Sequence, residues 1–382
     1  MKAYCLNNIS KVALAGLKAP DVIVEDINDA DSILVRSADM HEMDLNKNIL
    51  AVARAGAGVN NIPLDKYAEA GVVVFNTPGA NANAVKELVL AGMLLASRDI
   101  IGGNNWIKEN LDNANVGKDA EKAKKAFAGN EIYGKKIAVL GLGAIGILVA
   151  NACVDLGMKV VGYDPYLSID NALKLSKKVV YEKFLTDAVR DADFITVHVP
   201  ALDSTKGMIN KDVLYAATKG VVLLDFARDT LVNEKDLAEA LNNGQVKKFV
   251  TDFANANVVK LPNTIVLPHL GASTDEAEDN CAVMAVNELK DFIENGTILH
   301  SVNYPDLNPG VKQDGKRVCI NHKNIPGVIA SFSTAISKKG GNITNLVNKS
   351  KNDYAYTVLD VDGEVDVEAL AKIDGVLRVR VI

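Results

Sequence analysis

The sequence predicts an α/β protein with two parallel sheets and a smaller domain at its C-terminal end. Three observations lead to this prediction. Apolar runs alternate with helical stretches as far as residue 296, a glycine-rich turn joins one such run to a helix near residue 141, and the order of elements changes after residue 316. A chain of 382 residues is too long for one hydrophobic core, so two or three domains are expected.

The first α/β part spans residues 1 to 97. The runs SILVRS, ILAVARAG and GVVVFNTPG end in small or polar residues, which is typical of parallel strands. AVKELVLAGMLLASRDI follows with apolar residues at helical spacing. Residues 102 to 130 are polar and rich in Lys, which predicts a solvated helix and loop.

The second part contains six predicted strands, in the runs KKIAVLGLGAIG, KVVGYDPY, FITVHVP, GVVLLDFAR, KKFVTDF and NTIVLPHL. Helical stretches between them indicate a doubly wound sheet. A long amphipathic helix follows, with Ser273 and Glu276 as a capping box at its start and Gly296 just past its end. From residue 316 to 382 the order is strand, helix, strand, strand, helix, strand, which predicts a ferredoxin-like domain.

The composition excludes several classes of protein. Apolar residues make up 48% and charged residues 24%, and the net charge of −6 argues against nucleic acid or an anionic membrane as the main partner. Cys5, Cys153, Cys281 and Cys319 are far apart, so we expect reduced thiols and no metal site. No leader or long apolar segment is evident, so a cytoplasmic protein is expected.

The turn VLGLGAIG indicates a dinucleotide site. Gly141 would make the tight turn, Gly143 would let the backbone approach a pyrophosphate, and Gly146 would let the helix pack on the strand. The helix N-terminus would then face the phosphates. Asp164 ends the next strand, where a carboxylate accepts hydrogen bonds from ribose hydroxyls and repels a 2′-phosphate, which favours NAD over NADP.

Polar residues follow three later strands of this sheet. Arg228 follows VVLLDFA, Asp252 follows KKFVT, and His269 follows TIVLP. Ligands bind at the carboxyl ends of strands in such folds. Taken singly, Arg228 could form a surface salt bridge and His269 could be structural. Together, an arginine fork for a carboxylate and a histidine for proton transfer favour an active site beside the dinucleotide.

The chain resembles the D-isomer-specific 2-hydroxyacid dehydrogenases. The resemblance rests on RAGAGVNNIPLD, GLGAIG, ITVHVP, LDFARDTLV and PHLGAST, which occur in the family's order. It implies a flavodoxin-like substrate domain at 1–97 and 275–304, with a Rossmann-type NAD domain inserted at 98–274. A linker at 305–315 and a C-terminal domain at 316–382 complete the expected organisation.

The resemblance also implies roles for individual residues. Arg228 would hold the substrate carboxylate, His269 would be the acid/base, and Asp252 would contact the nicotinamide side of NAD. The expected substrate-binding residues are Arg36, Ser37, Arg54, Ala57 and Gly58. The expected cofactor-binding residues are Gly141, Gly143, Ala144, Ile145, Gly146, Asp164, Val199, Pro200, Ala227, Asp252 and Gly271.

The two arginines, Arg36 and Arg54, suit a phosphorylated substrate. The resemblance therefore implies oxidation of 3-phospho-D-glycerate to 3-phosphohydroxypyruvate, the first step of serine biosynthesis. The alternatives are a dehydrogenase for another 2-hydroxy acid, such as glycerate or 2-hydroxyglutarate, and an NAD- and serine-binding regulator with little catalysis.

The chain departs from the family at one catalytic position. A glutamate five residues past the Asp252 position usually pairs with the histidine, and here that position is Asn257. An amide can orient the ring but cannot offset a developing positive charge. We therefore expect a less basic His269 and a rate lower by about 10- to 1,000-fold.

The segment VCINHKNIPGVIASFSTAISKKGGNITNL resembles an ACT domain, a small regulatory fold that binds amino acids. The resemblance implies that His322, Asn324 and Asn342 bind L-serine as a feedback inhibitor. Because such domains pair between subunits, it also implies a homodimer or homotetramer, with coupling through the linker near Gly310.

Overall fold

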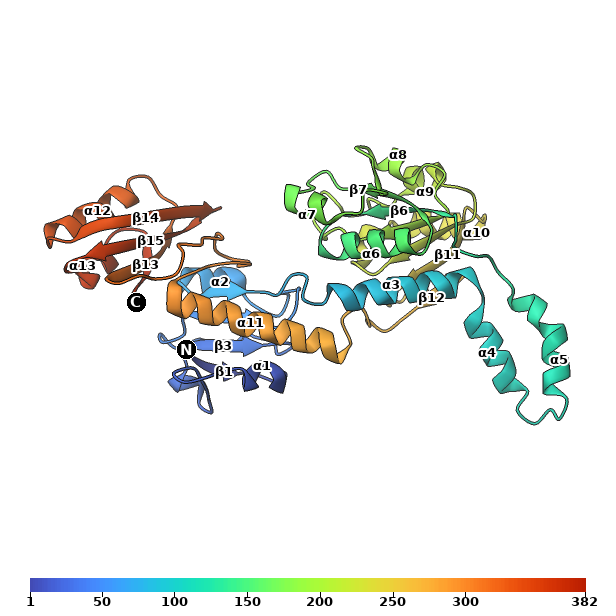
Figure 1. Cartoon of the computed structure of the whole chain (residues 1–382), viewed down its shortest axis with the longest axis horizontal. Helices are drawn as coiled ribbons and strands as arrows, with labels where there is room; N and C mark the ends of the chain where they lie inside the picture. The colour runs from blue at the N-terminus through green and yellow to red at the C-terminus, as the bar shows by residue number, and fades with distance from the viewer. The chain divides into compact units, whose positions relative to one another are not determined.

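The computed structural model describes residues 1–382 and divides into two compact units (Figure 1). The terminal unit comprises Met1–Asn81 and Asp275–Ile382, and the central unit comprises Ala82–Thr274. The chain therefore leaves the terminal unit once and returns to it, as expected for an inserted domain.

The terminal unit begins with a five-stranded parallel sheet in the order β2-β1-β3-β4-β5, which is the flavodoxin-like order. The sequence predicted only its three buried strands, because the side chains of the other two, β1 and β2, are mostly half-buried or exposed. Its elements are β1 (Lys2–Cys5), α1 (Lys11–Ala15), β2 (Val22–Val24), β3 (Ser32–Val35), β4 (Ala51–Arg54), α2 (Leu64–Glu69) and β5 (Val73–Phe75).

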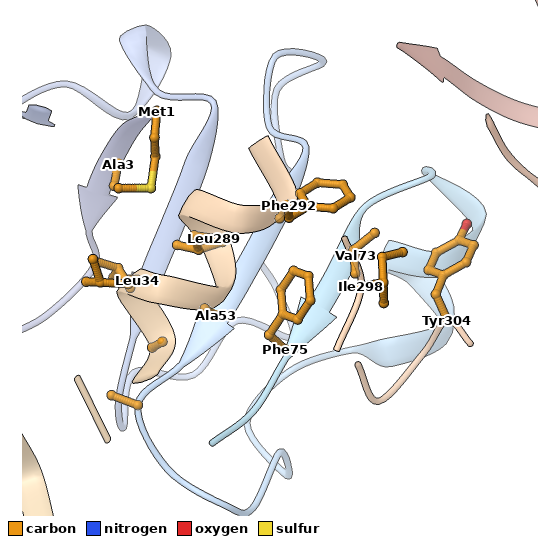
Figure 2. Close-up of a cluster of buried hydrophobic side chains, with 14 of the residues drawn as sticks. Met1, Ala3, Leu34, Ala53, Val73, Phe75, Leu289, Phe292, Ile298 and Tyr304 are labelled. Carbon is orange, nitrogen blue, oxygen red and sulfur yellow. The ribbon is translucent and has the colours of Figure 1, made fainter. Parts of the chain in front are cut away.

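Helix α11 (Asp275–Asn295) packs against this sheet. Its Leu289 and Phe292 are buried in one cluster with Leu34 and Phe75 of the strands (Figure 2). The helix ends at Asn295, and Gly296 just past its end has φ of 73°, as predicted. It begins at Asp275, so the expected capping box is wrong: the Ser273 hydroxyl lies outside the helix and donates to the carbonyl of His269.

The last part of the terminal unit is an antiparallel sheet in the order β14-β15-β13-β16, which confirms the ferredoxin-like prediction. Val318, Ile320 and Leu359 of the strands pack with Phe332 and Leu370 of the two helices. The elements are β13 (Lys316–Lys323), α12 (Val328–Lys338), β14 (Asn342–Lys351), β15 (Tyr354–Asp362), α13 (Val367–Ala371) and β16 (Val376–Val381).

Three arginines of this antiparallel sheet bind backbone carbonyls elsewhere in the terminal unit. Arg317, buried and paired with Asp360 at 2.6 Å, also donates to the carbonyls of Asn295 (2.9 Å) and Gly310 (2.6 Å). Arg378 and Arg380 donate to carbonyls of residues 49 and 70 and of residues 292 and 293, respectively. The expected linker at 305–315 is thus held at Gly310, and both sheets belong to one unit.

The central unit is a doubly wound parallel sheet in the order β12-β11-β10-β9-β6-β7-β8. Its seventh strand, β8 (Val180–Tyr181), has two exposed residues and was not predicted. The other strands are β6 (Lys136–Leu140), β7 (Lys159–Tyr163), β9 (Phe194–Val197), β10 (Val221–Asp225), β11 (Val246–Thr251) and β12 (Thr264–Val266). The helices that pack on it are α3 (Ala82–Ser97), α6 (Ala144–Asp155), α8 (Leu185–Val189), α9 (Lys211–Ala216) and α10 (Glu234–Asn242), and α7 (Ile169–Lys174) contacts α6.

Helix α3 belongs to the central unit, so the boundary falls at residue 82 and not at the expected residue 98. The reason is packing: Val85, Val89 and Met93 are buried in the central unit's core. Helices α4 (Ile100–Glu109) and α5 (Val116–Ala123) then form an arm that extends from the sheet and has no buried residue (Figure 1). Across the whole structure, every helix is too short or too polar to cross a bilayer.

Candidate active site

The turn between β6 and α6 requires its first and last glycines. Gly141 has φ of 95°, and a Cβ there would lie 2.6 Å from the carbonyl oxygen of His198. A Cβ on Gly146 would lie 1.8 Å from the carbonyl oxygen of Gly141. Gly143 is the N-cap of α6 without a side-chain cap, and the space beside it is open. The first N–H groups of Ala144, Ile145 and their neighbours are therefore free of a capping side chain, as a phosphate site needs.

Asp164 is held beside this turn. Its Oδ2 accepts from the N–H of Leu142 at 2.8 Å, and its Oδ1 accepts from the N–H of Tyr166 at 2.8 Å. Val199 flanks the other side, since its side chain lies 2.9 Å from the Cβ position of Gly141, and Pro200 follows it. A cradle closed to side chains, an open helix N-terminus and a fixed carboxylate fit the pyrophosphate and ribose of NAD.

Arg228, Asp252 and His269 follow three adjacent strands, because β10 pairs with β11 and β11 pairs with β12. Arg228 is exposed and forms no ion pair; its Nη1 donates to the carbonyl of Ala227 at 2.7 Å. The surface salt bridge that would have explained Arg228 is therefore not formed within the central unit. Its charge is free to meet an anionic ligand.

Asp252 ties down the loop that carries His269. Its Oδ2 accepts from the N–H of Gly271 at 2.8 Å, and its carbonyl accepts from the N–H of His269 at 2.9 Å. Burial raises the pKa of Asp252, against the hydrogen bond from Gly271 and the charges of His269 and Arg228. His269 has φ of 49° and lies against Phe253, with ring centroids 4.9 Å apart. A left-handed histidine is uncommon, and two backbone contacts maintain it here.

Asn257 is committed to a different partner. Its Nδ2 donates to Oε2 of Glu234 at 2.8 Å, and Asn255 donates to the other oxygen of the same carboxylate at 2.9 Å. The ring of His269 makes no hydrogen bond within the central unit. Asn257 is thus bound to Glu234, the first residue of α10.

The expected substrate residues of the terminal unit gather at the ends of β3 and β4, which are paired strands. Asn7 holds the first two: its Oδ1 accepts from the N–H of Arg36 at 2.9 Å, and its Nδ2 donates to the Ser37 hydroxyl at 3.0 Å. Arg54 Nε donates to the carbonyl of Arg36 at 2.9 Å. The loop of Ala57 and Gly58 follows, and the Ala57 carbonyl accepts from Asn76 at 2.6 Å.

Arg36 also carries an ion pair that the sequence did not predict. Its Nη2 lies 2.5 Å from Oε1 of Glu278 in the first turn of α11, and both side chains are about two-fifths exposed. The guanidinium that was expected to bind the substrate is therefore already paired with a carboxylate of the protein. Arg36, Ser37, Arg54, Ala57 and Gly58 lie in the terminal unit, and Arg228, Asp252, Asn257 and His269 lie in the central unit.

The expected effector residues lie on the C-terminal sheet and its loops. His322 is buried, its Nδ1 donates to the carbonyl of Lys323, and its Nε2 lies 2.8 Å from Thr357 Oγ1. Burial lowers its pKa. Asn324 directly follows β13 and Asn342 is the first residue of β14, so the two lie on either side of α12 in the chain. Both are exposed. Both ring nitrogens of His322 are therefore occupied, and the Asn324 amide donates to the carbonyl of Asn352 at 3.2 Å.

Sequence reasoning missed four polar residues at the sites: Asn7, Asp225, Glu234 and Glu278. Asp225 alone had a local signal, since a carboxyl that ends four apolar residues in VVLLD needs a reason to be buried. The others contact residues between 21 and 242 positions away in the chain, so no local pattern marks them.

Comparison with known proteins agrees with this geometry. Residues 90–271 match the NAD binding domain of the D-isomer specific 2-hydroxyacid dehydrogenases. The D-3-phosphoglycerate dehydrogenase of Haemophilus influenzae is 30% identical, over 95% of this chain and 89% of its own length. The chain belongs to the D-isomer specific 2-hydroxyacid dehydrogenase family.

Within that family its relatives include several proteins named D-3-phosphoglycerate dehydrogenase. The Bacillus subtilis protein is 34% identical over 82% of this chain. The NAD⁺-bound 3-phosphoglycerate dehydrogenase of Entamoeba histolytica aligns with a TM-score of 0.62 and 25% identity, over 80% of this chain and 99% of that one. The chain spans about half the length of some relatives, including 57% of the Methanocaldococcus jannaschii protein and 48% of a Mycobacterium tuberculosis protein.

Proposed function

We propose that this protein catalyses the NAD-dependent oxidation of 3-phospho-D-glycerate to 3-phosphohydroxypyruvate, the entry to serine biosynthesis. The observation that carries the proposal is the arrangement at the carboxyl ends of β10, β11 and β12. There an unpaired arginine, a buried aspartate and a histidine held in a fixed backbone conformation share one sheet with the glycine turn and Asp164. The names of the relatives support the choice of substrate.

The residues would divide the reaction between them. Bound NAD would accept a hydride from C2 of the hydroxy acid, or return it in the reverse direction. Arg228 would bind the substrate carboxylate through its fork of N–H groups and orient C2. His269 would take the proton of the 2-hydroxyl as the hydride leaves. The Asp252 carboxylate would keep the His269 loop in place through Gly271.

Arg36 and Arg54 would bind the phosphate group. The Arg54 side chain lies against the backbone of Arg36, and two guanidinium groups favour a doubly charged phosphate over an uncharged hydroxymethyl group. Glu278 competes for Arg36 in the free protein, and a dianionic phosphate would displace it because a phosphate offers more charge and more acceptor atoms. This preference supports a phosphorylated substrate over glycerate, whose terminal group is uncharged, and over 2-hydroxyglutarate, whose distal carboxylate carries only one charge.

One observation favours a second candidate, an NAD-binding regulator with little turnover. His269 has no carboxylate partner in the central unit, because Asn257 is turned to Glu234. Without a negative partner the imidazolium that forms during oxidation is less stable. Slow turnover with intact NADH binding would be the mark of this second function.

We also infer that L-serine binds the C-terminal domain. Helix α12 starts at Gly327 without a side-chain cap, so its first N–H groups could receive a carboxylate, with Asn324 and Asn342 for the amino and hydroxyl groups. The coupling route would be rigid and not hinged at Gly310. Arg317 and Arg380 bind the last carbonyls of α11, and the first turn of that helix carries Glu278, the partner of Arg36.

A homodimer or homotetramer is the assembly that the arm supports. Helices of ten and eight residues are marginal by themselves in water, yet α4 and α5 bury no residue in the monomer. Ile100, Ile101, Ile107 and Leu111 are exposed on or beside this arm and would be covered by a second copy. Four free cysteines, three of them buried, are compatible with the proposed cytoplasmic location.

The test is NADH oxidation with 3-phosphohydroxypyruvate from about pH 5.5 to about pH 9, with and without L-serine. Turnover that exceeds turnover with hydroxypyruvate supports the phosphorylated substrate, and suppression by serine supports the regulatory role. Tight NADH binding without turnover would overturn the dehydrogenase proposal in favour of the regulator. Faster turnover with an unphosphorylated 2-oxo acid would overturn the substrate assignment.

A further inference from the structure

Asp225 is a buried carboxyl that the proposed mechanism does not use. It is the last residue of β10, in which all five side chains are buried, and it is itself 0% exposed. A carboxyl at such a position is costly unless its oxygens have partners or it carries a proton. Its neighbours across the sheet are Val197 of β9 and Thr251 of β11, which supply no positive charge.

One oxygen of Asp225 anchors the turn that carries Arg228. Its Oδ1 accepts from the N–H of Ala227 at 3.0 Å and from the N–H of Arg228 at 3.4 Å. Its Oδ2 is buried and has no hydrogen-bond partner. The carboxyl therefore fixes the backbone of the substrate-binding arginine with one atom and leaves the other unpaired.

Asp252 repeats this arrangement on the next strand. It directly follows Thr251, the register partner of Asp225, and its Oδ2 accepts from Gly271. Its Oδ1 is also buried without a partner. One carboxyl is thus the last residue of β10 and the other directly follows β11. Each holds a loop in place with one oxygen and keeps its second oxygen buried and unpaired.

We propose that Asp225 is a positioning residue for Arg228, and that its unpaired oxygen carries a proton while Asp252 is ionised, so that the two buried carboxyls are not charged together. The anchoring stands on the contacts above. The proton stands on a buried oxygen without a partner, and the electrostatic surroundings of the two carboxyls decide which of them carries it. Only the kinetic consequence rests on the proposed function.

The electrostatic surroundings support this division. Burial raises the pKa of Asp225 to about 7, the hydrogen bonds from Ala227 and Arg228 oppose the rise, and the charges of Asp252 and Asp229 add to it. The charges that act on the pair from outside it are those of Asp229, Arg228 and His269. His198 follows Val197, the β9 neighbour of Asp225, and burial lowers its pKa to about 3, so it adds no charge. Below about pH 7 Asp225 is neutral. Above that pH it adds a negative charge beside the arginine that binds the substrate carboxylate.

Two variants separate anchoring from ionisation. In D225N the side-chain carbonyl still accepts from both N–H groups but cannot ionise. In D225A the acceptor is lost, and the turn at Arg228 loses both hydrogen bonds. We expect KM for 3-phosphohydroxypyruvate to rise about tenfold in D225A at every pH. In the wild type KM should rise about threefold or more from about pH 6 to about pH 8.5, and in D225N it should stay flat.

A titration that needs no turnover decides the proton. The carboxyl carbons of ¹³C-aspartate-labelled wild type and D225N are followed by NMR from about pH 5 to about pH 9. A resonance with a midpoint near 7 in the wild type and absent from D225N supports the proposal, and superimposable titrations overturn it. If D225A does not fold, D225N still decides the ionisation. If D225A keeps the wild-type KM and pH profile, the positioning role is overturned. If no variant turns over, the proposed function fails while the NMR titration still decides the proton.

Discussion

Replacing Asn257 with glutamate restores the usual family residue but creates a conflict at Glu234. Asn257 donates its amide to Oε2 of Glu234 at 2.8 Å. A carboxylate at position 257 cannot donate, and it would face the carboxylate of Glu234 at hydrogen-bond range. The substitution alone is therefore expected to destabilise the loop and not simply to rescue His269.

The size of this effect follows from two contributions. A hydrogen bond to a charged group stabilises by about 1.5–3 kcal/mol. Two carboxylates at ~4 Å repel by about 1 kcal/mol in water-like surroundings, which is the appropriate setting because Asn257 is exposed and Glu234 half-buried. We expect N257E to lower the free energy of unfolding by about 2 kcal/mol, after allowing for relaxation of the exposed side chains.

Urea unfolding of four proteins measures this coupling: wild type, N257E, E234Q and the double variant. The double variant should recover about 1–2 kcal/mol relative to N257E, because the new glutamine amide can donate to the new carboxylate. The same proteins are assayed for turnover against pH. We expect a rise of about tenfold or more in the double variant, in which the carboxylate at 257 is free of charge repulsion and can pair with His269.

Three results would refute this reasoning. If N257E is as stable as the wild type and shows no coupling to E234Q, the contact between Asn257 and Glu234 does not matter to the fold. If N257E alone raises turnover as much as the double variant, the carboxylate reaches His269 in spite of Glu234. If both leave rate and pH profile unchanged, the missing glutamate is not what limits His269.

Three further predictions concern other parts of the chain. E278Q frees Arg36 from an ion pair that is about two-fifths exposed, so KM for 3-phosphohydroxypyruvate should fall about two- to threefold in a steady-state assay. Burial raises the pKa of Glu288 to about 9, so the folded protein holds a proton that the unfolded chain releases. The contribution of Glu288 to the free energy of unfolding is therefore most favourable below the ordinary pKa of glutamate. It is lost as pH rises toward 9, by up to about 1.4 kcal/mol per pH unit. Urea unfolding should show that the free energy of unfolding of E288Q depends less on pH than that of the wild type. G143A should fold normally, because space beside Gly143 is open, yet weaken NADH binding about tenfold or more by fluorescence titration, whereas G141A should lose stability.

The first two of these predictions have a control variant in the chain, and the third has a result that would contradict it. For E278Q the control is D279N, since Asp279 pairs with Ser10 and not with Arg36; an equal fall in KM would show a general charge effect. For E288Q it is E294Q, whose carboxyl is exposed and whose pH dependence should match the wild type. For G143A, unchanged NADH affinity would show that the backbone there does not approach the cofactor.

The sequence by itself determined the type and order of most elements. Buried parallel strands have continuous apolar sequences, so β6, β9 and β10 were predicted from the sequence alone. The glycine turn was also predictable from the sequence. A side chain at Gly146 would clash with the backbone a few positions earlier, and one at Gly141 would clash with the backbone after the neighbouring strand. The positions of Arg228, Asp252 and His269 at strand ends followed from the same local pattern.

Elements without a local signal were decided by tertiary structure. The exposed two-residue strand β8 exists only because β7 offers it an edge. Helix α3 has an ordinary amphipathic pattern, which says that one face is buried but not in which core, and packing assigned it to the central unit. The expected linker was fixed at Gly310 by Arg317, a residue whose burial beside Asp360 no composition could show.

The same limit applies to the site. Sequence named the residues that carry chemistry, but not the partners that set their charge and freedom. Glu278 pairs with Arg36, which is 242 positions away in the sequence, and Glu234 accepts a hydrogen bond from Asn257, which is 23 positions away. Side-chain contacts of this kind depend on register and helix placement to within a single residue, because a one-residue shift turns a strand's side chain to the opposite face. Local patterns specify which face is buried, and only the folded chain specifies what each polar atom finds there.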